Sequence, residues 1–285
     1  ALVFALVRAN VWGWGSAQTL LVLAAAAVLL TTFVILQLRG RHPLVPPRLF
    51  RSRTLVGADV GMLIAGAGLF AVFFFLTLYM QDLLHYSPLK TGIAYLPLSI
   101  LLVMSAGVGS RILGRVGARP ILVTGFLLGA AGLALLARLS PTSGYLDLLP
   151  SLVLIGTGMG GAFVSVTSSA VAGVPQEDTG VASALLNASQ QIGGSLGLAI
   201  LTAVATARFD AVAPRVPTPA ALASATTSAY AYAFIVGALL MVSAAVIGGL
   251  LLRPRPAEPR PVVESAVTPS PAAVVRQMTR CGCHG

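Results

Sequence analysis

The sequence predicts an all-α integral membrane protein, a bundle of about seven spanning helices. Three observations carry this prediction. Of the 285 residues, 56% are hydrophobic and only 9% are charged, whereas a soluble domain carries about 25% charged residues because its surface faces water. The mean hydropathy is +0.91. The apolar residues also gather in runs of about 20 residues, the length at which a helix crosses a bilayer.

Seven apolar runs are predicted to be the spanning helices. They cover approximately residues 17–38, 54–80, 91–110, 120–138, 148–171, 180–205 and 229–252. Pro97 lies inside the third run and should kink it. Residues 206–228 contain three prolines and are predicted to form a longer loop. The Pro-rich composition of residues 253–285 predicts a disordered tail.

Lysine and arginine counts in the connections predict the orientation. Eleven occur in one alternating set of connections, which comprises residues 39–53, 110–120, 172–179 and the start of the tail, and five occur in the other set. Because cytoplasmic loops carry the excess of positive charge, the first set and the C-terminus are predicted to be cytoplasmic. The net charge of +10 is then a consequence of topology, which argues against nucleic-acid binding.

Small residues spaced four apart predict helix-packing faces. Lipid gives helices no hydrophobic reason to associate, so close approach of their backbones must hold them together. Gly156 with Gly160, and Gly193 with Gly197, form two such pairs.

Polar residues on the sixth run are the leading candidates for a substrate cavity, because polar groups at membrane depth usually face protein or water. Their spacings of three and four place them on one helical face: Ser183, Asn187, Gln190 and Gln191. Hydrogen bonding between helices would account for them equally well.

Asp59 is the one acid clearly within an apolar run. Buried, it could take up a proton, but its shallow position favours an ion pair with an arginine such as Arg53.

Signatures of enzymes are absent from the sequence, which has no HExxH, no nucleotide-binding glycine loop ending in Lys-Ser/Thr and no Gly-x-Ser-x-Gly. We therefore expect no catalytic site, no cofactor and no metal centre. Cys281 and Cys283 could hold a soft metal, but incidental thiols in a frayed tail are the simpler interpretation. A membrane-embedded enzyme is disfavoured because no His, Asp or Glu residues cluster within the apolar runs.

Several segments together resemble the C-terminal half of the fourteen-helix drug:proton antiporters of the major facilitator superfamily. They are Gly13-Trp14 before an apolar run, LYMQDLLHYSPLKTGIAYLP (78–97) and GVASALLNASQQIGGSLGLAI (180–200). The basic stretch SRILGRVGARPIL (110–122) resembles the superfamily's cytoplasmic loop motif G-x-L-a-D-R-x-G-R-K-x-x-L. Arg115, Gly117 and Arg119 match the motif and Arg111 adds a further charge, whereas Gly114 stands at the position of its Asp.

The resemblance implies an architecture and a function. Residues 1–7 would end one linker helix, 17–38 would form a second, and 54–252 would form the C-terminal six-helix domain. A missing N-terminal half would complete the transporter, with the substrate bound between the halves. The implied function is proton-coupled efflux of amphipathic organic compounds across the plasma membrane. Alternatives are export of an endogenous metabolite or peptide product, and a stand-alone seven-helix membrane scaffold or sensor.

Overall fold

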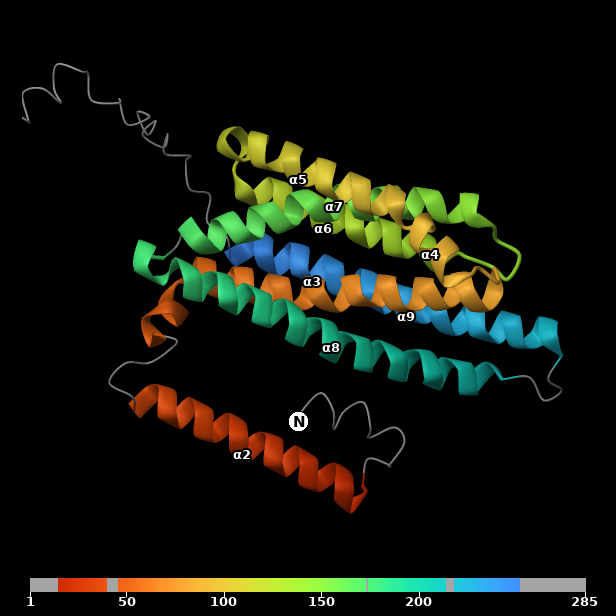
Figure 1. Ribbon diagram of the computed structural model, residues 1–285, viewed down its shortest axis with the longest axis horizontal. Coiled ribbons are helices and arrows are strands. Elements are labelled where there is room, and N and C mark those ends of the chain that lie inside the picture. The colour runs from red at the N-terminus through yellow and green to blue at the C-terminus, as the bar shows by residue number, and fades with distance from the viewer. Residues whose placement is uncertain (1–14, 40–45, 173, 214–217, 252–285) are drawn as a thin grey trace, which may run out of the picture. The chain divides into compact units, whose positions relative to one another are not determined.

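The computed structural model describes residues 15–39, 46–172, 174–213 and 218–251. The predictions made for residues 1–7, for the tail at 253–285 and for Cys281 and Cys283 lie outside these residues. Within them every regular element is a helix (Figure 1). The main helices are α2 (Ala17–Arg39), α3 (Arg53–Leu78), α4 (Pro88–Ala94), α5 (Leu96–Val116), α6 (Ala118–Leu136), α7 (Tyr145–Ala172), α8 (Thr179–Val212) and α9 (Pro219–Leu251). Short turns are η1 (Pro47–Arg51), η2 (Tyr79–Leu83) and η3 (Gln176–Asp178).

Seven of these helical segments are long and apolar enough to cross a membrane. This result confirms the predicted all-α membrane fold, and each span overlaps one of the seven apolar runs. The predicted loop at 206–228 was wrong in extent, because α8 continues to Val212 and α9 already begins at Pro219. The third span is interrupted at Tyr95, between α4 and α5, and Pro97 stands in the first turn of α5. That position suits a residue without an N–H group.

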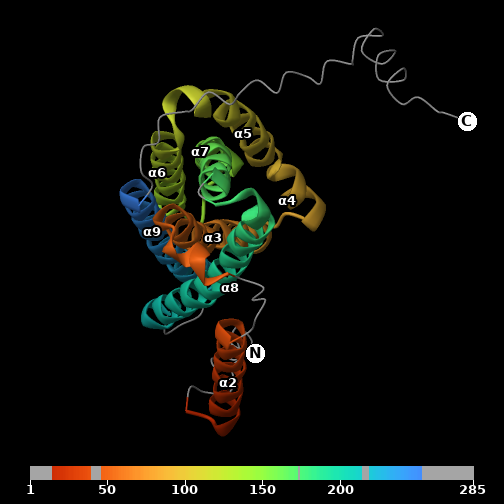
Figure 2. The ribbon, with the colours of Figure 1, turned by 90° about the vertical axis from the view of Figure 1, so that its left-hand side faces the viewer.

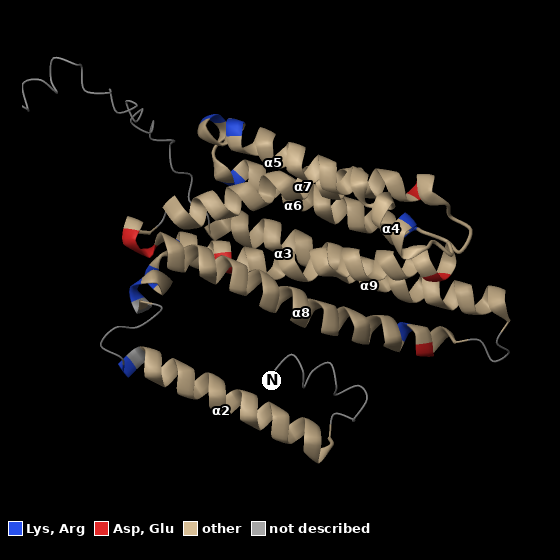
Figure 3. Ribbon diagram, viewed as in Figure 1, with Lys and Arg blue, Asp and Glu red and all other residues tan. Residues whose placement is uncertain are grey.

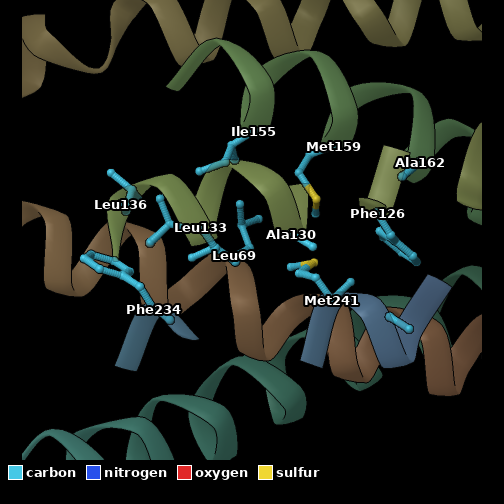
Figure 4. Packing of buried hydrophobic residues seen from close by; sticks show 14 of the residues in the cluster. Leu69, Phe126, Ala130, Leu133, Leu136, Ile155, Met159, Ala162, Phe234 and Met241 are labelled. Atoms are coloured by element: carbon cyan, nitrogen blue, oxygen red, sulfur yellow. The ribbon is translucent and has the colours of Figure 1, made fainter. Parts of the chain in front are cut away.

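The packed core lies between α3, α6, α7 and α9 (Figure 4). Side chains that are nearly inaccessible come from all four helices, among them Leu69, Phe126, Leu133, Met159 and Phe234. Both views of the ribbon place α5 on one side and α8 on the other, with α7 and α3 between them (Figure 2). The two outer helices are therefore held by different partners, α5 mainly by α7 and α8 mainly by α3.

Glycines set these two helix pairs at close range. A Cβ atom at Gly156 would lie 2.6 Å from the main-chain oxygen of Leu98, and one at Gly160 would overlap the oxygen of Leu102. On α8, a Cβ at Gly193 would overlap the oxygen of Leu63 on α3, and one at Gly197 would overlap Ala67. Because backbone atoms cannot rotate away, these sites admit only glycine at the present helix separation.

Charged residues gather towards the two ends of the bundle (Figure 3). The end at which α5 meets α6 is rich in arginine, and the connections before α3 and before α8 lie at the same end. At the opposite end two tyrosine hydroxyls donate hydrogen bonds: Tyr79 to the Ser140 oxygen of the loop before α7 at 2.7 Å, and Tyr145 of α7 to the Ala94 oxygen of α4 at 3.0 Å. The apolar bodies of the helices thus lie between two polar ends, as a membrane requires.

Candidate functional site

The polar residues predicted on one face of α8 divide into two groups in the structure. Asn187 and Gln191 are exposed, whereas Ser183 and Gln190 are half-buried. The main-chain oxygen of Gln190 lies against Gly66 of α3, so its side of the helix forms part of the α3–α8 contact. The exposed amides are four residues apart and therefore neighbours on α8. These two amides form the exposed polar strip of α8.

The hydrogen-bonding capacity of this strip is only partly used. The Asn187 amide donates to the Ser183 main-chain oxygen at 3.0 Å, while the Ser183 hydroxyl, outside the strip, donates to the Thr179 oxygen at 3.0 Å. Gln191 has no side-chain hydrogen bond within the described residues. An exposed amide offers both donors and an acceptor, so the Gln191 side chain remains free to hydrogen-bond another group.

Asp59 of α3 is half-buried and contacts α8 rather than an arginine. Its Oδ1 accepts a hydrogen bond from the Ser189 hydroxyl at 3.3 Å. The ion pair expected with Arg53 is not formed among the residues that the structure describes, so that expectation was wrong. Ser189 lies between Asn187 and Gln191 in the sequence. The carboxyl group is therefore coupled by one hydrogen bond to the helix that carries the polar strip.

The basic motif forms the end of α5 and the start of α6, which are joined by a single residue. Arg111 and Arg115 lie in the last two turns of α5, and Arg119 lies in the first turn of α6. Gly117 alone reverses the chain, with φ = +85°, a conformation that favours glycine. Gly114, which stands at the position of the motif's Asp, is helical and lies within α5. All three arginines are exposed, and none forms an ion pair within the described ranges.

A further charged cluster joins the connection before α3 to the connection before α8. The Arg48 Nη2 atom lies 2.8 Å from Glu177 Oε1 and 3.0 Å from Asp178 Oδ2, and its Nε donates to Asp178 at 3.1 Å. Asp178 is buried, with 5% of its surface exposed. These hydrogen bonds, above all the one to Asp178 and then that to Glu177, raise the pKa of Arg48 above its ordinary value. The guanidinium therefore stays charged throughout the physiological range.

Sequence reasoning missed this cluster, although a signal existed. Glu177 and Asp178 are the only acids in the connections 39–53, 110–120 and 172–179, all three of which are predicted to be cytoplasmic. Acids in a predicted cytoplasmic loop invite a search for an arginine partner. Five arginines lie in residues 39–53 alone, however, and nothing in their spacing distinguishes Arg48 from the others.

Replacing Arg48 by Gln should lower the melting temperature of the protein by about 2–4 °C. The substitution removes the guanidinium that pairs with the buried Asp178 carboxylate, and breaking a buried ion pair by removing one partner is destabilising. Arg51→Gln is the matched control, since Arg51 is exposed in the same turn and forms no ion pair within the described ranges. Thermal unfolding of both variants in one detergent checks the expectation, and equal melting temperatures would contradict it.

Comparison with known proteins places this bundle in a family. Residues 1–198 match the family described as the Major Facilitator Superfamily. A puromycin resistance protein of Streptomyces alboniger is 36% identical over 95% of this chain and 54% of its own length. A tetracenomycin C resistance and export protein of Streptomyces glaucescens is 35% identical over 75% of this chain and 40% of its own length. A cephamycin export protein of Amycolatopsis lactamdurans is 34% identical over 92% of this chain and 51% of its own length.

These matches cover most of this chain but only part of each relative. The chain spans about half the length of the curated relatives that it matches. The family match itself extends over more than half of the chain and includes α2 to α7 and most of the polar face of α8. With its seven apolar helices and its close-packed glycines, this chain is a multi-span membrane protein that belongs to the major facilitator superfamily.

Proposed function

We propose that this chain is the C-terminal part of a proton-coupled exporter of amphipathic organic compounds. The observation that carries the proposal is the exposed strip of Asn187 and Gln191, two amides on the surface of a helix long and apolar enough to span a membrane. Such groups are costly against lipid and suit a cavity wall. The relatives named for puromycin resistance, for tetracenomycin C resistance and export, and for cephamycin export support this class of substrate.

The proposed transporter needs a second helical half, which would face the polar strip of α8. Facilitators of this kind bind substrate near the midplane between two halves and alternate access by rocking one against the other. The excess of arginine in alternate connections supports a cytoplasmic C-terminus and insertion in the plasma membrane. Substrate taken from the cytoplasm would then leave on the opposite side.

The proposal is tested with the complete transporter that contains this chain. We expect cells that produce it to accumulate less puromycin than cells with the empty vector, and a protonophore to abolish the difference. Puromycin is the first probe because it is the compound named for the first of the relatives above. Accumulation that stays equal in both cells, for puromycin and for a panel of aromatic and cationic compounds, would overturn the drug-export proposal. Export of an endogenous product would then be the candidate to pursue.

Asp59 is the proposed proton-binding group within this half. It is half-buried, and its only hydrogen bond within the described residues comes from Ser189 of α8. Protonation would change the charge of the carboxyl group at the α3–α8 contact. Proton binding there would therefore act on the helix that carries the polar strip.

Asp59→Asn should abolish the stimulation of export by a pH gradient while the protein remains folded. Asparagine keeps the size of the side chain and still accepts a hydrogen bond from Ser189, but it cannot bind a proton. Ser189→Ala is the control, because it removes the hydrogen bond and leaves the carboxyl group. Transport by everted membrane vesicles with and without a pH gradient provides the measurement. Full stimulation in Asp59→Asn would assign the proton to another acid.

A further inference from the structure

A groove on the far side of the bundle from α8 lies between α5, α6 and α7. Its volume is about 390 Å³, within the range of roughly 300–1,000 Å³ common for ligand sites. The groove exists because α5 and α6 both pack on α7 through glycines and hardly touch one another. Gly109 of α5 meets Gly161, and Gly125 of α6 meets Gly158. The floor of the groove is thus the glycine face of α7.

The walls of this groove suit hydrocarbon. Met104 and Val108 of α5 are 60% and 54% exposed along it, and Leu128 of α6 stands opposite. Three hydroxyl groups line it, and each one already donates to the main chain. Ser105 donates to Leu102 and Gly156, Thr124 donates to Pro120 and Ile121, and Thr157 donates to Val153 and Leu154. No hydroxyl in the groove therefore needs a polar partner to donate to.

Two arginines continue the α5 wall of the groove. Arg111 and Arg115 follow Met104 and Val108 at spacings of three and four, which places all four on one face of α5. Both arginines are exposed and have no acidic partner in the part of the chain that the structure describes. Arg119 does not lie beside the groove. It precedes Leu128 by nine residues, which places it about half a turn away from the groove side of α6.

We propose that this groove binds an anionic phospholipid, with an acyl chain against Met104 and Val108 and its phosphate at Arg111 and Arg115. The apolar groove matches the acyl chain, which lies within the membrane, and the unpaired arginines match the phosphate, which lies at the membrane surface. A free phosphate would make no use of the groove, and a neutral lipid would make no use of the arginines. The site is separate from the polar strip of α8 and does not depend on drug export.

Native mass spectrometry of the complete transporter tests this proposal, with phosphatidylglycerol and phosphatidylcholine of equal acyl length as probes. We expect preferential retention of phosphatidylglycerol. Neutralising one arginine should weaken phosphatidylglycerol binding about fivefold. The double variant Arg111→Gln with Arg115→Gln should no longer prefer phosphatidylglycerol to phosphatidylcholine. Arg119→Gln is the matched control and should retain the preference. Val108→Trp, which fills the groove and keeps both arginines, should also lose retention. Arg111→Lys with Arg115→Lys keeps both charges and should restore the preference for phosphatidylglycerol if the glutamine variants fold poorly.

Three results would overturn the proposal. An equal loss of phosphatidylglycerol retention in Arg119→Gln would show that the lipid is attracted to the arginine-rich end in general and not to the groove. Competition by glycerol phosphate as effective as that by the lipid would show a free-anion site. A cross-link from the Val108→Cys variant to another helix of the transporter, or to a second copy, would show that protein covers the groove.

Discussion

Gly193→Ala should reduce the amount of folded transporter in the membrane by at least about fivefold, through a clash at the α3–α8 contact. The added Cβ would overlap the main-chain oxygen of Leu63, which no rotamer change can move. The helices would have to separate, and overpacking of this kind costs about 1–3 kcal/mol. A loss of 1–2 kcal/mol changes the folded-to-unfolded ratio by a factor of about 5–30 and cellular abundance by several-fold.

Two further glycines serve as controls for this prediction. Gly180 lies on the same helix with open space around it, so Gly180→Ala should leave abundance unchanged or slightly higher, because Ala favours the helix by up to about 1 kcal/mol. Gly68 of α3 would meet the terminal methyl group of Met241, a flexible side chain that can move. Gly68→Ala should therefore have a smaller effect than Gly193→Ala. Abundance and elution profile of a fluorescent fusion in detergent give the measurement, and similar values for all three variants would contradict the argument.

The sequence predicted the helical architecture well because one physical rule dominates it. A segment within the bilayer must satisfy its own backbone hydrogen bonds, so each long apolar run becomes a helix. The errors occurred at the ends of the runs. The three prolines of residues 206–228 suggested a loop from residue 206 onward, yet α8 extends past Arg208 to Val212. The Arg208 Nε atom donates to Ser228 of α9 at 3.2 Å, and its guanidinium lies 4.4 Å from the centre of the Tyr232 ring. These partners are distant in sequence, so hydropathy could not reveal them.

The candidate site was less predictable for a related reason. Spacing placed Ser183, Asn187, Gln190 and Gln191 on one face, but a face spans a wide arc of the helix. The approach of α3 at Gly66 decides which part of that arc is covered. In the same way, the shallow position of Asp59 suggested an arginine partner, whereas close packing of α3 on α8 placed Ser189 beside it. Helix periodicity gives directions around an axis, and only the packing shows which neighbour lies in each direction.

Gln191→Leu should reduce export about fivefold at low substrate concentration, the largest effect that we expect from the polar strip. A hydrogen bond to a substrate contributes about 1 ± 0.5 kcal/mol, and leucine supplies none while keeping similar bulk. Asn187→Leu should have a smaller effect, because the Asn187 amide already donates to Ser183 of its own helix. Ser195→Ala is the control: its hydroxyl donates to the Gln191 main-chain oxygen at 2.6 Å and so has no proton to offer a substrate.

The measurement is initial export rate against substrate concentration in everted vesicles, normalised to the amount of transporter. Loss of a contact made equally in the bound substrate and during transport should raise the half-saturating concentration and leave the maximal rate unchanged. Equal rates for Gln191→Leu and the unmodified transporter would place the strip in a helix contact instead of the cavity. A fall in abundance without a change in normalised rate would lead to the same conclusion, because a helix contact supports folding and a cavity wall supports binding.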